Sequence, residues 1–222
     1  MEHRFWQQRW EQAQLGFHLS FVHPILKRHL ARYSLAPGAR VFLPLCGKTL
    51  DIGWLLSEGY AVVGAELSEL AVAQLFAELG VEPVVSEWEG GQCWQHDALT
   101  VFQGDIFALT PATLGTVDLV YDRAALVALP PTMRDAYARQ LVELSDAAPQ
   151  LLITFEYDPA EKEGPPFPVL PAEVARHYAD THKIEELSRK DVLDASLSFR
   201  DAGVSCFVEV AWRLLPLAKG HA

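Results

Sequence analysis

The sequence predicts an α/β fold in which a mostly parallel, doubly wound β-sheet carries helices on both faces. Short apolar runs typical of buried strands alternate with segments of helical periodicity, which is the pattern of a parallel sheet. Glycine or proline stands at several of the boundaries between them. Of the 222 residues, 50% are hydrophobic and 21% are charged, so the chain can bury a core without disulfides or a structural metal.

The N-terminal segment is predicted to be helical. Aromatic and aliphatic residues recur near helical spacing over residues 5–22. Pro24 is expected to open a second, short helix, because proline suits the first position of a helix. Pro37-Gly38 then separates these helices from the predicted sheet.

Two strand–helix units follow this break. Each begins with an apolar run that suits a buried parallel strand and continues with a helical face that stops at a glycine. The predicted order is a strand at 41–45, a helix between Leu50 and Gly59, a strand at 60–65 and a helix between Ser68 and Gly80.

Further strands and helices are predicted in the rest of the chain. The segment GGQCWQHD is expected to be a turn, and the Pro/Gly-rich segment at 158–171 a loop. The last strand lies in SCFVEVAWRLL and is expected to be an antiparallel edge or hairpin strand, because no helix follows it. The other predicted elements are strands at 84–85, 99–102, 117–122 and 150–157 and helices at 133–144 and about 172–180.

Composition excludes several classes of partner. Lysine and arginine number 18 against 29 aspartates and glutamates, a net charge of −11 that disfavours nucleic acid. The three cysteines include no C-x-x-C pair, which argues against a disulfide framework and a cysteine-based metal site. The N-terminus has no apolar signal region, and no long apolar stretch suits a membrane span. We therefore expect a cytoplasmic protein.

The turn after the first strand is a candidate for ligand binding, because doubly wound sheets bind ligands at the carboxyl ends of their strands. Gly47 permits close approach of a ligand to the backbone, although a glycine that only shapes the turn is an equal alternative. The dinucleotide pattern G-x-G-x-x-G is missing, since the next glycine is Gly53, inside the helix. Lys48-Thr49 lacks the upstream glycine of a phosphate-binding loop. The turn suits a small zwitterion better than a pyrophosphate.

Acidic residues follow the next strands of the predicted sheet. Glu66 comes about twenty residues after the first turn, where a carboxylate can accept from both hydroxyls of a ribose; a solvated glutamate is the alternative. Asp105 can accept from an adenine amino group, with Ile106 beside the ring, but it could equally cap a turn. Together these residues favour an adenosine-containing ligand.

Several strings in order along the chain resemble one known family. VFLPLCGKTLDIGWLLSEGYAVVGAELSELAV strongly resembles the cofactor-binding segment of the thiopurine S-methyltransferase family, and the bacterial branch is the most similar. The strings that extend the resemblance over almost the whole chain are FWQQRWEQAQLGFH, YDRAALVALP, YDPAEKEGPPFPV and GVSCFVEVAWRLL.

The resemblance implies a class I methyltransferase (Rossmann-like) fold and S-adenosylmethionine as cofactor. Residues 1–222 would then form one domain, with residues 1–36 as a helical cover over an α/β core at 37–222. That core would be a seven-stranded, mostly parallel sheet with an antiparallel last strand.

The matching positions imply five cofactor-binding residues. Trp10 would pack over the cofactor, and Leu45 would contact its methionine part. Glu66 would hold the ribose and Ile106 would flank the adenine. Arg123 would lie near the methionine carboxylate and the acceptor.

Some of these residues have a plain structural alternative. Trp6 and Trp10, with Phe5, could be ordinary packing of a helix on the core, which is the favoured interpretation for Trp6. Arg123 follows Asp118 and Asp122 and could be only an ion-paired structural residue. Asp51 is expected on a solvated face.

One position departs from the family. In relatives, a basic residue often stands a few positions before the glycine of the last strand pair, and it is thought to help hold a purine substrate. Here Ser198 and Phe199 precede Arg200, so the basic residue is shifted. The departure bears on purine recognition more than on methyl transfer.

The implied reaction is in-line transfer of a methyl group to the sulfur of thiopurines and other aromatic or heterocyclic thiols. Such thiols ionise near neutrality, so no strong general base is required. The sequence shows no convincing histidine or cysteine catalyst. His18, His23 and His29 lack the i, i+4 spacing of a helical metal site and are expected to be surface or core residues. Arg123 could stabilise a developing thiolate. The water-excluding groups are expected to be Trp10, Phe17, Phe21 and the GPPFPV loop, which would close over the acceptor.

Three alternatives stay open at this point. A methyltransferase for another small acceptor, such as a halide or a selenium or tellurium oxyanion, would share the fold. A nicotinamide dehydrogenase is disfavoured by the missing glycine pattern. A non-catalytic cofactor-binding protein is disfavoured by the intact strand ends. We expect a monomer, because no heptad repeat or flat apolar edge demands a partner.

Overall fold

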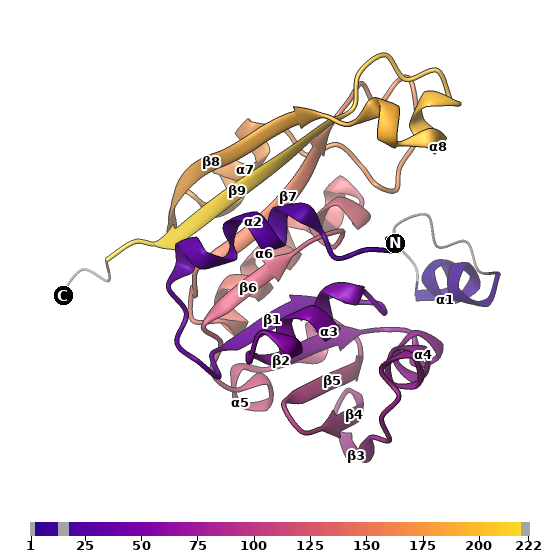
Figure 1. Ribbon diagram of the computed structural model, residues 1–222. Helices are drawn as coiled ribbons and strands as arrows, with labels where there is room; N and C mark the ends of the chain where they lie inside the picture. The colour runs from indigo at the N-terminus through magenta and orange to yellow at the C-terminus, as the bar shows by residue number, and fades with distance from the viewer. Residues whose placement is uncertain (1–2, 13–17, 219–222) are drawn as a thin grey trace. The chain divides into compact units, whose positions relative to one another are not determined.

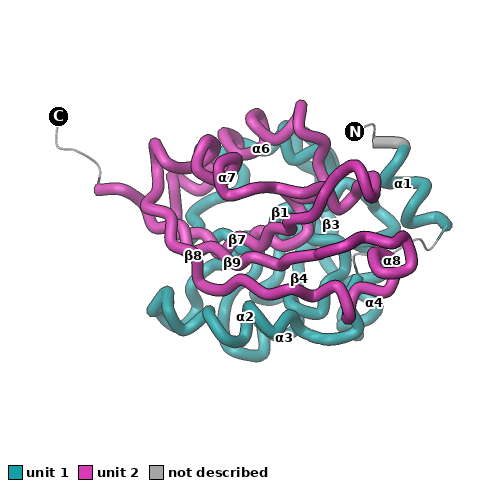
Figure 2. The backbone as a smooth tube through the Cα atoms, turned by 90° about the horizontal axis from the view of Figure 1, so that it is seen from above, with its two compact units in different colours: residues 1–121 teal, residues 122–222 magenta. Residues whose placement is uncertain are grey.

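The computed structural model describes residues 3–12 and 18–218 of the chain (Figure 1). The chain divides into two compact units, residues 1–121 and residues 122–222, which Figure 2 distinguishes by colour. We call them the N-terminal unit and the C-terminal unit.

The N-terminal unit contains a mixed sheet. Its strands are β1 (Arg40–Pro44), β2 (Ala61–Glu66), β3 (Val84–Trp88), β4 (Gly91–His96), β5 (Leu99–Gly104) and β6 (Leu119–Asp122). The order in the sheet is β3-β4-β5-β2-β1-β6. β1 is parallel to β2 and β6, and β2 is parallel to β5, whereas β3, β4 and β5 form antiparallel pairs. The carboxyl ends of β1, β2, β5 and β6 therefore share one edge.

The helices of this unit precede β1 or connect its strands. They are α1 (His3–Glu11), α2 (Pro24–His29), α3 (Leu50–Ser57), α4 (Glu69–Leu79) and α5 (Pro111–Leu114), with short 3-10 turns η1 (Leu30–Tyr33) and η2 (Ile106–Ala108). The Thr49 hydroxyl accepts from the first turn of α3, and the Ser68 hydroxyl accepts from that of α4. Gly80, with a φ of 70°, ends α4 in the left-handed conformation that glycine tolerates.

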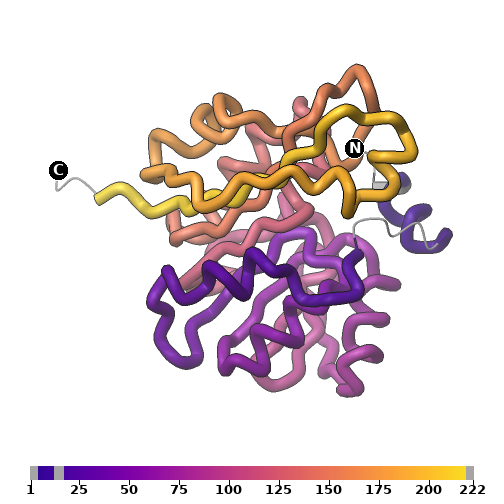
Figure 3. Tube along the Cα trace, turned by 45° about the horizontal axis from the view of Figure 1, so that its top comes forward, coloured from indigo at the N-terminus to yellow at the C-terminus, as the bar shows by residue number. Residues whose placement is uncertain are grey.

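The C-terminal unit contains three antiparallel strands and the longest helix. Its elements are η3 (Leu126–Ala128), α6 (Pro131–Leu144), β7 (Gln150–Glu156), α7 (Pro171–Tyr178), β8 (His182–Asp191), η4 (Leu193–Ala195), α8 (Leu197–Arg200) and β9 (Val208–Pro216). β9 lies between β7 and β8 and is antiparallel to both. Figure 3 shows β8 and β9 running side by side as orange and yellow segments near the C-terminus.

An aromatic cluster organises the connection between β8 and β9. The rings of Phe199 and Phe207 stack with centroids 3.8 Å apart, and Phe155 stacks on Phe207 at 4.8 Å. Tyr157 meets the edge of Phe199 at 5.2 Å. Because Phe155 and Tyr157 come from the end of β7 and the segment just after it, this cluster fixes the β8–β9 connection to the end of that strand.

The structure corrects four predictions of secondary structure. The helical pattern of residues 5–22 ends at Glu11; Leu19 and Val22 are not helical, and Leu15 and Phe17 lie outside the described residues. The segment expected to be a turn at 90–97 contains β4, which pairs with β3 and β5. β8 was not predicted at all, so β9 is an internal strand and not the edge; its antiparallel direction, beside β8, agrees with the prediction. Among the described residues there are nine strands, two more than the seven expected, because β4 and β8 were not predicted.

The chain has three cysteines, and none of them forms a disulfide bond. Cys46, Cys93 and Cys206 are free thiols. Within residues 3–12 and 18–218, no helix is long and apolar enough to cross a bilayer. Over the same residues, no cluster of three potential ligands could hold a metal ion.

His29 on α2 predicts a pH dependence of stability. Its ring is 3% exposed, and its two nitrogens find no hydrogen-bond partner among the described residues. Burial, followed by the charges of Arg32 and Arg28, lowers the pKa of His29 below its ordinary value. As the pH falls below about 6.5, the unfolded chain therefore binds a proton that the folded chain resists, and stability falls. Thermal unfolding of His29→Phe between about pH 7.5 and pH 5.5 should show a smaller loss of Tm than the wild type.

A matched variant separates this effect from general acid sensitivity. His96 lies at the surface, so His96→Gln should keep the full loss of Tm. Equal losses in His29→Phe and the wild type would contradict the assignment.

Candidate functional site

The candidate site lies at the carboxyl edge of the sheet in the N-terminal unit. Pro44 pairs with Ala65 in the β1–β2 register, and Glu66 pairs with Gln103 in the β2–β5 register. Leu45 and Glu66 therefore stand at neighbouring strand ends, and Ile106 follows two residues after β5. The structure brings these three predicted residues to the same edge.

Glu66 is the buried acidic group of this edge. Glu66 is only 6% exposed, so it is not the solvated glutamate that the sequence left as an alternative. The Gly47 N–H donates to Oε2 at 2.8 Å, and the Ser68 N–H donates to Oε1 at 2.8 Å. Burial raises the pKa of the Glu66 carboxyl, and these backbone donors oppose the shift. The Leu67 N–H also donates to this carboxylate, which has about four acceptor sites, so about one site is left for a further hydrogen bond.

The turn after β1 has an unusual backbone. Leu45 has a φ of 47° and Gly47 a φ of 53°, so two residues of the turn are left-handed. The Cys46 N–H donates to Ala65 O at 3.0 Å, and this bond together with the one from Gly47 to Glu66 holds the turn to the end of β2. A left-handed leucine costs about 1–2 kcal/mol, and such conformations cluster at ligand sites.

Trp10 of α1 covers this turn. Its residue is 5% exposed, and a Cβ atom placed on Gly47 would lie 3.1 Å from Trp10 Cζ2. Glycine at position 47 therefore serves both the left-handed φ and the close approach of the indole. The N-terminal helix thus reaches the predicted ligand edge within its own unit.

Asp105 and Ile106 follow β5 at the same edge. The Asp105 carboxylate accepts from the Phe107 N–H at 3.0 Å, so it caps the turn η2, which was the alternative to a direct role with adenine. Ile106 is 4% exposed. The Gln103 side chain donates to Leu67 O at 2.9 Å and ties the end of β5 to the segment that follows β2.

Asp51 corrects a prediction. It was expected on a solvated face, but it is 1% exposed and accepts from the His23 N–H at 2.7 Å and the Tyr121 hydroxyl at 3.1 Å. This one carboxylate joins the start of α2, the first turn of α3 and the end of β6. Sequence reasoning missed it because an aspartate just after a capping threonine is usually exposed.

Arg123 directly follows β6 and belongs to the C-terminal unit, where it is half-buried. The aspartates offered as its alternative partners bind other groups. Asp118 accepts from the Arg40 N–H at 2.7 Å, and Asp122 accepts from the Tyr137 hydroxyl at 2.8 Å. Arg123 thus follows a fully buried aspartate that is already engaged.

The Pro-rich loop of the C-terminal unit is anchored from within that unit. The Tyr157 hydroxyl donates to Pro166 O at 2.6 Å, and the Phe167 N–H donates to Val127 O at 2.6 Å. The loop expected to cover the acceptor is therefore ordered against the segment after β6.

Arg200, the shifted basic residue, is exposed on α8, and its guanidinium lies 3.7 Å from the Asp201 carboxylate.

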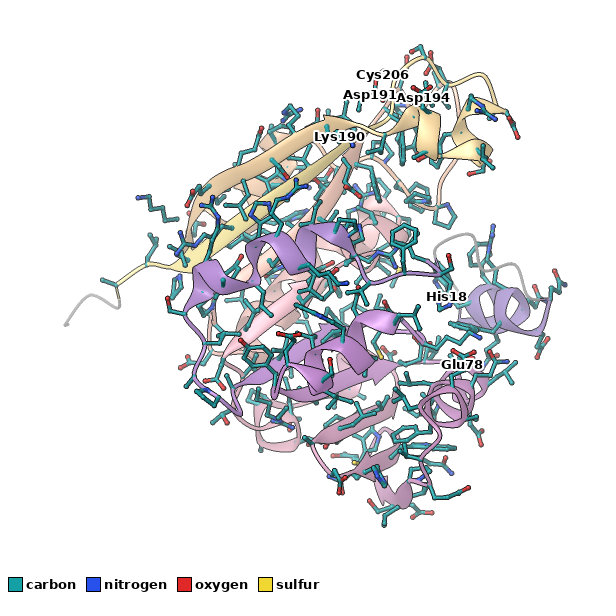
Figure 4. The ribbon with its side chains drawn as sticks, viewed as in Figure 1. His18, Glu78, Lys190, Asp191, Asp194 and Cys206 are labelled. Atoms are coloured by element: carbon teal, nitrogen blue, oxygen red, sulfur yellow. The ribbon has the colours of Figure 1, made fainter. Side chains whose placement is uncertain are left out.

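None of the three cysteines is suited to act as a nucleophile at neutral pH. Burial raises the pKa of the Cys46 thiol well above its ordinary value and also raises that of Cys93. Desolvation and the charge of Asp191 raise the pKa of Cys206, and Figure 4 shows these two residues together at the β8–β9 connection. The site therefore offers binding and alignment without a thiolate.

Comparison with known proteins finds a family along most of the chain. The family model described as "Thiopurine S-methyltransferase (TPMT)" matches residues 1–215. A thiopurine S-methyltransferase of Xanthobacter autotrophicus is 53% identical over 193 residues, which cover 86% of this chain and 91% of that protein. A thiopurine S-methyltransferase of Pseudomonas paraeruginosa is 46% identical over 96% of this chain and 99% of that protein.

Solved structures share the fold at low sequence identity. A 1,6-didemethyltoxoflavin-N1-methyltransferase of Burkholderia thailandensis, solved with S-adenosylhomocysteine, has a TM-score of 0.60 at 14% identity and covers 96% of this chain and 87% of its own. A TehB-like SAM-dependent methyltransferase of Corynebacterium glutamicum has a TM-score of 0.55 at 12% identity, covering 97% of this chain and 98% of its own. These likenesses confirm the predicted class I methyltransferase fold, with antiparallel strands at its C-terminal end.

Proposed function

We infer that this chain, which belongs to the thiopurine S-methyltransferase family, transfers a methyl group from S-adenosylmethionine to the sulfur of a thiopurine or a related aromatic thiol. The family match over residues 1–215 carries the inference. The buried carboxylate at the end of β2 supports it, because it would give the cofactor a polar anchor at this edge. A nicotinamide dehydrogenase is no longer an alternative.

The residues at the strand ends fit this cofactor. Glu66 would hold the ribose, since its backbone donors leave acceptor capacity on the carboxylate. Leu45 would meet the methionine part, Ile106 the adenine, and Trp10 would cover them from α1. Arg123 would serve the methionine carboxylate or the acceptor.

The protein's own contribution is alignment and the exclusion of water. S-adenosylmethionine supplies an activated methyl group on a sulfonium centre. The left-handed turn at 45–47 and the hydrogen bonds to Glu66 hold the residues of this edge in place. Alignment of this kind can account for roughly 7–11 kcal/mol of a barrier. Aromatic thiols ionise near neutrality, so the chain needs no general base.

The same proposal covers the domain organisation, the compartment and the oligomeric state of the protein. We propose one methyltransferase domain over 1–222, with residues 1–36 as its cover; the contact of Trp10 with the Gly47 turn supports that role. We also propose a cytoplasmic monomer. Three free thiols and a net charge of −11 support the compartment and the lack of a nucleic-acid partner.

Two measurements test the function. Calorimetry should detect binding of S-adenosylhomocysteine and none of NAD. A radiolabelled-methyl assay should then show transfer to 6-mercaptopurine and thiophenol. Selenite, tellurite and iodide are the acceptors that test the alternative, a methyltransferase for a halide or a selenium or tellurium oxyanion. Transfer to one of these and to no thiol would replace the proposal with that alternative, and no transfer to any thiol would contradict it.

A further inference from the structure

The segment after β6 carries Arg123, and its shape depends on Asp122. The Asp122 carboxylate is fully buried, and its Oδ1 accepts from the Leu126 N–H at 3.0 Å. Ala124, between them, has a φ of 63° in the left-handed region, which disfavours a residue with a side chain. The turn that presents Arg123 is therefore strained and held closed by the aspartate that precedes it.

Helix α6 braces this segment at two points. The Tyr137 hydroxyl donates to Asp122 Oδ2 at 2.8 Å, at the beginning of the segment. The Arg134 guanidinium donates through Nε to Leu129 O at 2.9 Å, at its end. Residues three apart lie on one face of a helix, so a single face of α6 fixes both ends.

Arg134 also reaches the Pro-rich loop. Its Nη1 donates to Pro168 O at 3.1 Å and to both carboxylate oxygens of Glu173 at 3.0 Å. Its guanidinium lies 5.8 Å from the centre of the Phe167 ring. One buried side chain thus ties the segment that carries Arg123 to the loop that the resemblance places over the acceptor.

The burial of the charged Arg134 side chain needs a reason other than stability. Arg134 is 1% exposed, and a well-packed apolar side chain often stabilises a protein as well as a buried ion pair does. What an apolar residue cannot supply is directional hydrogen bonds to two carbonyl groups on different segments.

We propose that Arg134 and Tyr137 are positioning residues that hold Arg123 and the loop at 165–168 in the arrangement required for the thiol acceptor. The proposal rests on the proposed function, since it assigns these segments to the acceptor. In this assignment Arg123 serves the acceptor and not the methionine carboxylate of the cofactor. Their loss is therefore expected to weaken use of the acceptor and to spare cofactor binding.

Tyr137→Phe is the sharpest test, because it removes one hydroxyl and keeps the buried ring. We expect kcat/KM for 6-mercaptopurine to fall about tenfold, which corresponds to one charge-assisted hydrogen bond. The Kd for S-adenosylhomocysteine should change less than about twofold. Arg134→Lys keeps the charge but loses the fork, so it should show the same split between kcat/KM and Kd.

A pH profile gives a readout that mere loss of stability would not move. Burial raises the pKa of Asp122 to about 6, while the Leu126 N–H, the Tyr137 hydroxyl and the Ala125 N–H hold it down; Tyr178 of α7 also faces its charge. Removing the Tyr137 hydroxyl raises this pKa further. The acid limb of kcat/KM for the thiol should therefore move to higher pH in Tyr137→Phe.

Controls separate the possible outcomes. Arg139, exposed on the same helix, provides Arg139→Met, which should leave kcat/KM and Kd unchanged. Equal losses of acceptor kcat/KM and cofactor affinity in Tyr137→Phe and Arg134→Lys, or no loss of either, would overturn the positioning role. A wild-type protein that binds S-adenosylhomocysteine but methylates no thiol would defeat the proposed function and this role with it, whereas an active wild type with unaffected variants defeats this role alone.

Discussion

Replacement of Glu66 by alanine should raise the Kd for S-adenosylhomocysteine by about 100-fold, which corresponds to roughly 2.7 kcal/mol. The carboxylate now accepts the N–H groups of Gly47 and Ser68, and in the complex we expect it to accept ribose hydroxyls as well. Each hydrogen bond to a charged group contributes about 1.5–3 kcal/mol, and a buried donor left without a partner adds its own cost. Calorimetric titration of the variant with S-adenosylhomocysteine measures the effect.

The isosteric variant Glu66→Gln distinguishes charge from shape. Its amide nitrogen would face one of the two backbone donors, so one hydrogen bond becomes a donor–donor contact. We expect a loss of affinity between those of the wild type and Glu66→Ala. Glu87, exposed on β3, supplies Glu87→Gln as the control with unchanged affinity. Wild-type affinity in Glu66→Gln would remove the ribose assignment.

The sequence predicts the parallel strands and their ends because both are local properties. Apolar runs at 41–45 and 60–65 can only be buried, and a capping Ser68 and a terminating Gly80 mark the helix between the strands of this region. Once the strands are parallel, Leu45 and Glu66 must reach the same edge. For this reason the sequence alone indicates Leu45 and Glu66 as candidate ligand residues.

β8 could not be predicted because it is an edge strand. Its sequence HKIEELSRKD alternates poorly and is dense in charge, as edge strands are when they avoid pairing with other chains. Arg189 in this strand pairs with Glu186 and Glu156, so its charges serve the edge and not a core. An edge strand as polar as β8 has the composition of a loop, so the sequence does not distinguish the two.

Asp51, Tyr137 and Arg134 could not be predicted because their partners are distant in the chain. Asp51 meets a residue 28 positions before it and another 70 positions after it. Arg134 meets Glu173, 39 positions away. Residue type and spacing give no sign of such pairs, and a charged residue is usually exposed. Burial of a charge is visible only when the tertiary structure supplies its hydrogen bonds.

Gly64 yields the second large effect. It lies inside β2, and a Cβ atom there would stand 2.7 Å from Cys46 Sγ and 3.6 Å from Val101 Cγ2. Gly64→Ala must therefore displace the cysteine, whose backbone N–H holds the turn to Ala65 O. Overpacking of a core costs about 1–3 kcal/mol, and in a protein of this size each kcal/mol lowers Tm by about 2–4 °C. Thermal unfolding should show this loss of Tm, and calorimetry should show weaker binding of S-adenosylhomocysteine because the turn moves.

The cysteine provides the compensating variant. Cys46→Ala removes the sulfur that the added methyl group would meet, so the double variant Gly64→Ala, Cys46→Ala should be more stable than the sum of the single effects predicts. Recovery of S-adenosylhomocysteine affinity in the same double variant would tie the effect to the turn after β1 and not to the strand in general. Strictly additive losses of stability and affinity would mean that the sulfur at position 46 does not set the need for glycine at position 64.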